Sequence, residues 1–256
     1  MPSSGLDPHT GTPDESAVAR AAARGEGKRA YVRAVFEQIA PTYDRLNHLL
    51  SLNIDRRWRR QAIAELNWQR APTATYLDLC AGTMDVAAAL VGTDGFSGRV
   101  IAADFAEPML RAGRHKAASA VVAPLVSDAV MLPFRDCSLA GALVAFGARN
   151  LASLDAGLRE ARRVLAPGAR LVILEFTTPG SPVVRAAYHA YFHQVLPFIG
   201  GAMSGHRTAY EYLPRSVANF PAPEGLATAM RSAGFESVRW RSLSLGIAAI
   251  HVGTRE

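Results

Sequence analysis

The chain has 256 residues, of which 49% are hydrophobic and 20% charged, and its formal net charge is +6. This composition is too apolar for a disordered chain, and two cysteines are too few for a disulfide scaffold. No apolar run reaches the roughly 18 residues that a membrane helix needs, whereas the length allows a self-sufficient core.

The positive charge comes from arginine, since 26 arginines stand against two lysines, Lys28 and Lys116. The arginines are dispersed and form no stripe interleaved with aromatic residues, so the charge does not predict a nucleic-acid partner. The first residues lack the basic and apolar segments of a secretory signal. The lone thiols of Cys80 and Cys137 are typical of a reducing compartment, and we therefore expect a cytoplasmic location.

Residues 1–28 carry three prolines and four glycines without a strand pattern, which predicts a flexible N-terminal tail. Within this tail, Asp14–Arg24 has the composition of one short helix. We expect residues 29–256 to form a single domain.

Helical periodicity begins near Tyr31, where apolar residues follow the spacing of one helix face. Pro41 is expected to kink or split this helix, because proline removes a backbone donor. A second helix is predicted at Asp55–Asn67, with Asp55 near its N-terminus.

Short apolar runs then alternate with helical segments. The runs are nearly continuous, as in strands that helices cover on both faces, so the pattern predicts a doubly wound, mostly parallel sheet. The predicted strands are Thr75–Cys80, Arg99–Asp104, Val121–Ser127, Leu139–Phe146 and Ala169–Phe176. The predicted helices between them are Val86–Val91, Pro108–Ala120 and Leu154–Leu165, the last ended by Pro167-Gly168.

An aromatic and histidine-rich segment, Pro182–Met203, interrupts this pattern. We expect a lid at about residues 180–220, with plain core packing as the alternative. His189 and His193 share a helix face at a spacing that also suits a metal, but no third ligand matches, and a packed or solvent-facing pair is favoured.

A helix at Glu224–Ala233 and two closing strands complete the predicted domain. The strands are Phe235–Leu243 and Ile247–Gly253. Parallel strands followed by such a terminal hairpin are the outline of a class I methyltransferase sheet, an inference by analogy of fold alone.

The first candidate site is the loop after the first strand, which includes Asp78, Gly82 and Thr83. Ligands of such sheets bind at the carboxyl ends of the strands. A dinucleotide would need three glycines so that the backbone can approach its pyrophosphate, and this loop has only one. S-adenosylmethionine has no phosphate, so the loop favours it over NAD. An ordinary strand–helix turn is the alternative.

Acidic residues end the next two strands. Asp104 can accept from both hydroxyls of a ribose, with a helix-capping acid as the alternative. Asp128, followed by Ala129, can accept from an adenine amino group, although aspartate is common in turns.

The loop after the fourth strand brings Arg149 and Asn150 to the same edge. Arg149 can stabilise an oxyanion and Asn150 can orient a hydroxyl or a water, whereas the alternative is a structural arginine paired with an acid. Near the N-terminus, Tyr43 and Asn47 share a helix face beside Asp44, and a surface cluster is an equal interpretation.

Together these residues resemble the ubiquinone/menaquinone biosynthesis C-methyltransferases over about residues 32–253. Two elements are specific to this family, Tyr43-Asp44-x-x-Asn47 and Phe146-Gly147-x-Arg149-Asn150. The elements around Asp78 and Asp104 are specific only to the superfamily.

The resemblance implies a Rossmann-like class I methyltransferase with a seven-stranded sheet, N-terminal helices and a helical lid. It implies S-adenosylmethionine as co-substrate, no metal, and C-methylation of a polyprenyl quinol, either demethylmenaquinol or a polyprenyl benzoquinol. The family places the donor against Thr83, Asp104, Asp128 and Ala129, and we add Asp78, Gly82 and Ala145 to this site. Ala145 stands where the family often has serine, and Met84 where many members have glycine or alanine.

Methylation at a ring carbon requires the electron-rich quinol. Arg149 is assigned to oxyanion stabilisation or water alignment, because a guanidinium with a pKa above about 12 is a poor base. Asp44, or a water held by Asn150 and Tyr43, is the candidate base.

A polyprenyl substrate also predicts contact with a membrane surface, at the inner face of the cytoplasmic membrane. Arg56–Arg60 can contact anionic lipid, with a solvated helix face slightly favoured. A homodimer is left open. Two other functions are also left open: another S-adenosylmethionine-dependent methyltransferase with an apolar acceptor, and a donor-binding subunit without catalysis.

Overall fold

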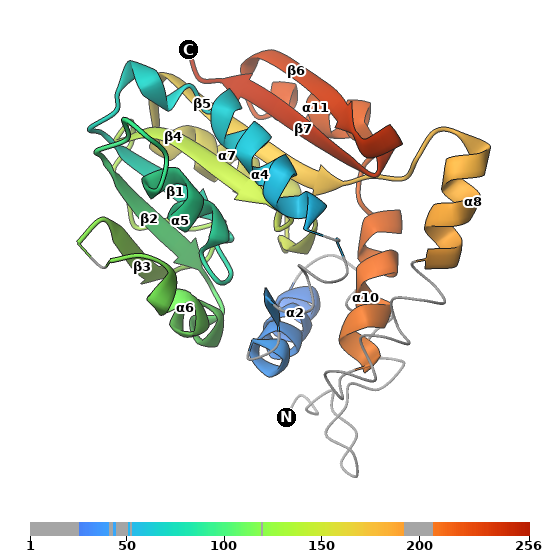
Figure 1. Ribbon diagram of the computed structural model, residues 1–256. Coiled ribbons are helices and arrows are strands. Elements are labelled where there is room, and N and C mark those ends of the chain that lie inside the picture. The colour runs from blue at the N-terminus through green and yellow to red at the C-terminus, as the bar shows by residue number, and fades with distance from the viewer. Residues whose placement is uncertain (1–25, 41–42, 45–50, 52, 119, 192–206) are drawn as a thin grey trace.

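The computed structural model describes residues 26–40, 43–44, 51, 53–118, 120–191 and 207–256 (Figure 1). Residues 1–25 of the predicted tail, Asn47, His193 and residues 192–206 of the predicted lid lie outside the described residues.

Seven strands form one sheet in the order β3-β2-β1-β4-β5-β7-β6. Strands β1 to β5 pair in parallel, and β7 runs antiparallel to both β5 and β6. The strands are β1 Thr75–Leu79, β2 Arg99–Asp104, β3 Val122–Val126, β4 Leu139–Ala145, β5 Leu165–Phe176, β6 Glu236–Leu243 and β7 Ala248–Thr254. The predicted doubly wound, mostly parallel sheet with a closing hairpin is confirmed.

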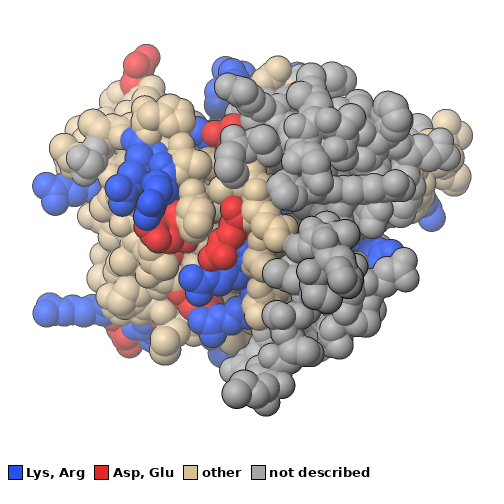
Figure 2. Space-filling view, turned by 90° about the horizontal axis from the view of Figure 1, so that it is seen from below, with Lys and Arg blue, Asp and Glu red and all other residues tan. Residues whose placement is uncertain are grey.

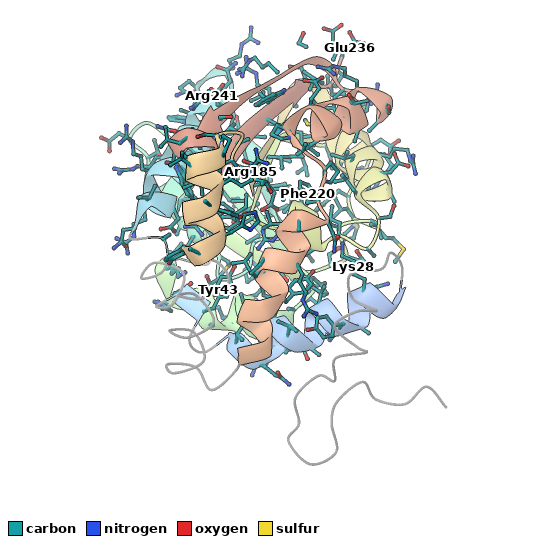
Figure 3. The ribbon with its side chains drawn as sticks, turned by 90° about the vertical axis from the view of Figure 1, so that its right-hand side faces the viewer. Lys28, Tyr43, Arg185, Phe220, Glu236 and Arg241 are labelled. Atoms are coloured by element: carbon teal, nitrogen blue, oxygen red, sulfur yellow. The ribbon has the colours of Figure 1, made fainter. Side chains whose placement is uncertain are left out.

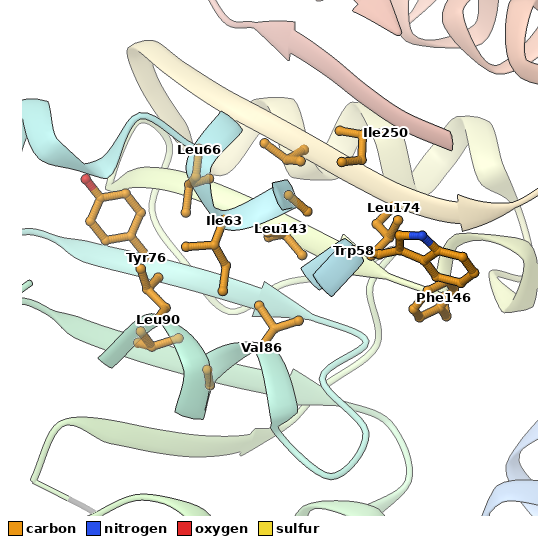
Figure 4. Close-up of a cluster of buried hydrophobic side chains, with 14 of the residues drawn as sticks. Trp58, Ile63, Leu66, Tyr76, Val86, Leu90, Leu143, Phe146, Leu174 and Ile250 are labelled. Atoms are coloured by element: carbon orange, nitrogen blue, oxygen red, sulfur yellow. The ribbon is translucent and has the colours of Figure 1, made fainter. Parts of the chain in front are cut away.

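Helices cover both faces of the sheet, which explains the continuous apolar runs of its strands. Successive strand residues point to opposite faces, so Tyr76 packs into one buried cluster and Leu77 into the other. The first cluster lies under α4 (Ile54–Glu65) and α5 (Asp85–Val91) (Figure 4). The second lies under α7 (Leu154–Val164) and α11 (Pro223–Ser232).

A third group of elements lies beyond the carboxyl edge of the strands (Figures 1 and 3). We call it the cap, and it consists of α2 (Glu26–Ile39), residues 43–44 and α10 (Arg207–Ala218). Tyr31 and Tyr212 hold α2 and α10 together, with ring centroids 5.7 Å apart. The cap therefore has a small apolar core of its own, separate from the two clusters of the sheet.

Several boundaries differ from the prediction. Helix α2 begins at Glu26, inside the segment assigned to the tail. Helix α7 ends at Val164, just before Pro167-Gly168 as predicted, but strand β5 begins at Leu165 instead of Ala169 and includes this pair. Gly168 adopts a φ of 78°, which glycine reaches without strain. The backbone can therefore turn there and continue from the end of α7 directly into the sheet.

Helix α10 lies within the predicted helical lid of about residues 180–220, but the sequence pattern gave this helix no bounds of its own. It contains Pro214, and proline lacks the backbone donor that a helix interior uses, so the sequence pattern argues against a helix there. Helix α8 (Pro182–Ala190) occupies the first part of the predicted lid, and its His189 is exposed. Helix α6 (Glu107–Gly113) is shorter than expected and continues as a 3-10 turn, η2, at Arg114–Lys116.

None of the helices among the described residues is both long and apolar enough to cross a bilayer.

Candidate active site

A cleft opens at the carboxyl ends of β1, β2 and β4 and reaches to the cap. It holds about 910 Å³, counting the space that opens to solvent. The predicted site residues that line it are Tyr43, Asp78, Gly82, Thr83, Asp104, Asp128, Ala129, Ala145 and Asn150. Seen from below, acidic and basic side chains lie next to one another on the part of this face that is not grey (Figure 2).

The loop after β1 is wound unusually tightly. Cys80, Gly82 and Met84 all have φ values between 53° and 64°, in the left-handed region that side chains disfavour. The amide of Ala81 donates to the carbonyl of Ala103 at 3.0 Å, which ties the loop to the end of β2. Burial raises the pKa of the Cys80 thiol well above its ordinary value, so this thiol stays protonated.

Two glycines allow neighbouring segments to approach this loop closely. A Cβ on Gly113 of α6 would lie 2.1 Å from the carbonyl oxygen of Thr83. A Cβ on Gly147 would lie 2.3 Å from Cβ of Cys80. Any side chain at either position would push the surrounding segment away, so these glycines set the shape of the cleft.

Asp104 is fixed by the backbone. Its Oδ2 accepts from the amide of Gly82 and its Oδ1 from that of Ala106, both at 2.8 Å. Burial raises the pKa of this carboxyl group. A carboxylate has about four acceptor positions, so two amide contacts leave acceptor capacity for a ligand in the cleft.

Asp78 is almost fully buried, and its Oδ2 accepts from the amide of Ala87 in α5 at 3.0 Å. Burial raises the pKa of Asp78 to about 7. Asp78 therefore anchors the beginning of α5 at the floor of the cleft.

Asp128 lies at the other side of the cleft beside the cap. Its Oδ2 pairs with Arg29 of α2 at 2.9 Å, and its Oδ1 accepts from the amide of Val130 at 3.1 Å. Arg29 is not among the predicted site residues.

Lys116 joins three side chains at the edge of the cleft. Its Nζ lies 2.6 Å from Oδ2 of Asp44, 2.5 Å from Oδ1 of Asp85 and 3.0 Å from Oγ1 of Thr83. Thr83 also donates from its hydroxyl to Asp44. Asp44, predicted as a candidate base, is therefore occupied by a cation and a hydroxyl beside the loop after β1.

The other lysine, Lys28, also holds the cap against the site. Its Nζ donates to the carbonyls of Arg149 at 2.7 Å and Leu151 at 2.9 Å, on either side of Asn150. Sequence reasoning missed both lysines. Their rarity was the available signal, because the chain otherwise uses arginine.

Arg149 turns away from the cleft. Its Nη1 lies 2.6 Å from Oε1 of Glu175, which is itself 1% exposed, and its Nε donates to the hydroxyl of Ser216 at 3.3 Å. Nη1 also donates to the carbonyl of Phe146. This placement favours the alternative of a structural arginine paired with an acid over direct contact with substrate.

Asn150 does face the cleft. It ends the 3-10 turn η3 (Ala148–Asn150), and its Oδ1 accepts from the Tyr212 hydroxyl at 3.1 Å. Burial raises the pKa of Tyr212 to about 12, so this hydroxyl remains a donor at neutral pH.

An aromatic wall closes the β4–β5 side. The rings of Phe146 and Phe176 lie 4.6 Å apart, and Trp58 packs against both at 6.2 Å. Arg59, another residue that sequence reasoning missed, lines the cleft with its guanidinium carbon 5.5 Å from the Phe146 ring centre. Of these three rings only Phe146 lines the cleft, so the cleft has acidic side chains at one end and an aromatic ring backed by two others at the other. Within the described part of the chain, no three metal-ligating side chains cluster.

Comparisons with known proteins agree with the resemblance found in the sequence. The model of the ubiE/COQ5 methyltransferase family matches residues 24–255. A protein of Thermus thermophilus named demethylmenaquinone methyltransferase is 48% identical over 86% of this chain and 100% of its own length. A protein of Geobacter sp. strain M21 named ubiquinone/menaquinone biosynthesis C-methyltransferase is 42% identical over 88% of this chain and 96% of its own.

Solved structures of low sequence identity share the fold. A crystal structure of an S-adenosylmethionine-dependent methyltransferase from Thermotoga maritima aligns with a TM-score of 0.62 at 20% identity, covering 88% of this chain and 100% of its own. One from Aquifex aeolicus aligns with a TM-score of 0.50 at 19% identity, covering 72% and 82%. Both are described as methyltransferases, and at these identities they support the fold alone.

Proposed function

Because the chain belongs to the ubiE/COQ5 methyltransferase family, we propose that it is the S-adenosylmethionine-dependent C-methyltransferase that converts demethylmenaquinol to menaquinol. A polyprenyl benzoquinol is the second acceptor, as the name of the Geobacter relative suggests. The observation that carries the proposal is the pairing, in one cleft, of an acidic end with an aromatic wall.

The acidic end suits S-adenosylmethionine. Asp78, Asp104 and Asp128 all line it, and clustered carboxyl groups would repel a diphosphate, whereas the sulfonium donor carries positive charge. We assign Asp104 to the ribose hydroxyls, and Asp128 with Ala129 to the adenine. Gly82 and Thr83 then lie with Asp78 at the amino-acid end. Arg59 lines this end with its guanidinium paired to Asp55 and Asp85.

The acceptor ring belongs against Phe146, with its hydroxyl near Asn150 and Tyr43. Loss of the phenolic proton to a water held by these two side chains raises electron density at the neighbouring ring carbon. This carbon bonds to the methyl group as the sulfur–methyl bond breaks and the neutral thioether leaves. The ring proton then passes to water and the oxygen regains a proton from water, so one proton is released overall and the aromatic quinol is restored. We prefer the water to Asp44 as proton acceptor, because Asp44 is paired with Lys116.

Arg149 acts in this scheme as a positioning residue. Its pair with Glu175 and its bond to the Phe146 carbonyl fix the turn that carries Asn150. A dry, preorganised pocket favours the reaction, since phenolate and sulfonium charges neutralise each other as the methyl moves.

The proposed substrate implies that methylation takes place at a membrane surface. A polyprenyl quinol is held by the bilayer, so the proposed enzyme meets it as a peripheral protein at the cytoplasmic side.

The test is methyl transfer from labelled S-adenosylmethionine to demethylmenaquinol in detergent, with the quinol and the oxidised quinone compared. We expect a product heavier by one methylene group from the quinol alone, and Asn150→Ala should lower its rate of formation. Absence of product from the reduced substrate would reject the proposal. Donor binding without turnover of the quinol would instead favour the non-catalytic subunit.

A further inference from the structure

The turn between β6 and β7 presents an exposed leucine in a strained conformation. Leu245, in the 3-10 turn η5 (Ser244–Gly246), has a φ of 60° and a ψ of 25° and is 78% exposed. A left-handed conformation is unfavourable for leucine, and an exposed leucine side chain does not stabilise the fold by burying apolar surface. Asparagine or glycine would avoid both penalties, so neither folding nor solubility explains a leucine here.

Two further exposed apolar residues lie at the same corner. Ile54, 41% exposed, begins α4, and one turn later Nε1 of Trp58 donates to the hydroxyl of Ser244 at 3.0 Å. Val183, 80% exposed, lies in the first turn of α8. The chain before α8 contacts the turn, since a Cβ on Gly246 would lie 3.4 Å from Cα of Pro179. We call Ile54, Val183 and Leu245 the apolar corner.

Arginines surround the apolar corner. Arg56, Arg57 and Arg60 are exposed on α4, and none of them pairs with an acidic side chain of the described residues. Arg185 of α8 is exposed and donates only to backbone carbonyls within the described chain (Figure 3). The interpretation of Arg56–Arg60 as one surface is thereby refined, because Arg59 is buried and belongs to the cleft.

The aromatic wall connects this corner to the cleft. Trp58 touches the turn through Ser244 and packs on Phe176, and Phe176 packs on Phe146, which lines the cleft. The turn also lies at the carboxyl edge of the sheet, because Ala248 pairs with Phe176 at the end of β5.

We propose that the apolar corner docks the protein on an anionic lipid bilayer. Leu245, Ile54 and Val183 enter the acyl boundary while the surrounding arginines contact lipid phosphates, the combination that interfacial binding requires. The packed rings from Trp58 to Phe146 then place the Phe146 end of the cleft on the side of the bilayer, from which a prenyl quinol arrives. This last step rests on the proposed function, whereas lipid binding itself does not.

Leu245→Asn separates the proposal from simple misfolding, because asparagine suits the left-handed turn. With the full chain and vesicles of equal parts phosphatidylglycerol and phosphatidylcholine, we expect binding that salt weakens. Leu245→Asn should bind about tenfold more weakly, the loss expected from one exposed leucine, while its thermal midpoint rises. Arg57→Gln should also weaken binding, by about fivefold.

The matched control is Val121→Asn. Val121 is 38% exposed and lies beside β3, at the edge of the sheet opposite β6. This variant should bind vesicles as the parent does. Equal vesicle binding by the parent and Leu245→Asn, or no binding by the parent, would overturn the proposal. So would a dimer of the parent in lipid-free solution that Leu245→Asn dissociates, since the corner would then bind a second copy.

Activity separates this inference from the proposed function. Leu245→Asn should methylate a short-chain, water-soluble quinol at the parental rate and lose rate only on quinol embedded in vesicles. If neither protein methylates the soluble quinol while vesicle binding follows the pattern above, the proposed function fails and the docking surface stands.

Discussion

Three acceptors of this chain hold the guanidinium of Arg149, and they decide how its motif works. Glu175 and the Phe146 carbonyl accept from Nη1, and the Ser216 hydroxyl accepts from Nε. The sequence places arginine beside asparagine in this loop, but only Asn150 reaches the cleft. One residue of the motif therefore builds the turn and the next faces the cleft.

Breaking this buried ion pair should lower the free energy of unfolding strongly, whereas removing both partners should lower it less. Glu175→Gln leaves a buried guanidinium without its counter-charge, and we expect the free energy of unfolding to fall by about 3–5 kcal/mol. The double variant Arg149→Met with Glu175→Leu should regain much of that stability in urea unfolding.

The same double variant tests the positioning role. If Arg149 acts only through the turn, the double variant should keep measurable kcat on soluble quinol, with its KM little changed. If the guanidinium stabilises the oxyanion directly, the double variant should be as inactive as Arg149→Met alone.

The raised pKa of Asp78 predicts that the stability of the fold depends on pH. Burial raises its pKa from 3.8 to about 7 in the folded chain, so the unfolded chain ionises first as the pH rises. Stability should therefore fall between about pH 4 and pH 7, by up to roughly 4 kcal/mol from this group. Asp78→Asn should be about as stable as the parent at about pH 3.5, below the pKa of the unfolded carboxyl, and more stable at pH 8, in urea unfolding at both pH values. An equal difference at the two pH values would contradict this assignment.

At the scale of elements, the cap is held to the sheet by a few polar contacts between distant segments. Lys116 ties residue 44 to the loop after β1, and Lys28 ties α2 to η3. Arg29 adds a third contact through Asp128. Each contact joins the cap to a segment that lines the cleft, so the cap and the donor site are mechanically linked.

Lys116→Met should therefore weaken donor binding. Without the cation, Asp44 and Asp85 repel each other and Thr83 loses a neighbour, so we expect the dissociation constant for S-adenosylmethionine to rise about tenfold, a loss near 1.4 kcal/mol. Calorimetry measures it, and Lys116→Arg, which keeps the charge, should recover part of the affinity. Parental affinity in Lys116→Met would show that this contact does not support the donor site.

For the whole molecule, the donor should stabilise the fold by mass action. At a concentration 100 times its dissociation constant, a ligand adds about 2.7 kcal/mol, which corresponds to a rise in Tm of roughly 5–10 °C for a chain of this size. Asp104→Asn should lose most of this rise. Asp136→Asn, an exposed acidic change before the amino end of β4, at the edge of the sheet opposite the cleft, should keep it. A full rise in Asp104→Asn would remove Asp104 from the donor site.

The sequence by itself determined the kind of fold and the residues at the edge of its strands. Hydrophobic periodicity predicted all seven strands, because strand and helix periods are local properties of the chain. Since parallel strands end at one edge, the positions of Gly82, Asp104, Asp128 and Asn150 along the chain predicted that they would meet. The bounds of helix α10 within the predicted helical lid escaped this reasoning, because tertiary packing with α2 overrides the local effect of Pro214.

Only the tertiary structure decided which charges pair. Lys116 with Asp44, Arg149 with Glu175 and Arg29 with Asp128 join segments that have no local relation, and their contacts depend on how helices cross the sheet edge. The left-handed conformation of Leu245 likewise depends on the packing of η5 against Trp58 and Pro179. Local periodicity fixes where an element runs, whereas the partner of a side chain is fixed by packing between elements, which spacing along the chain does not encode.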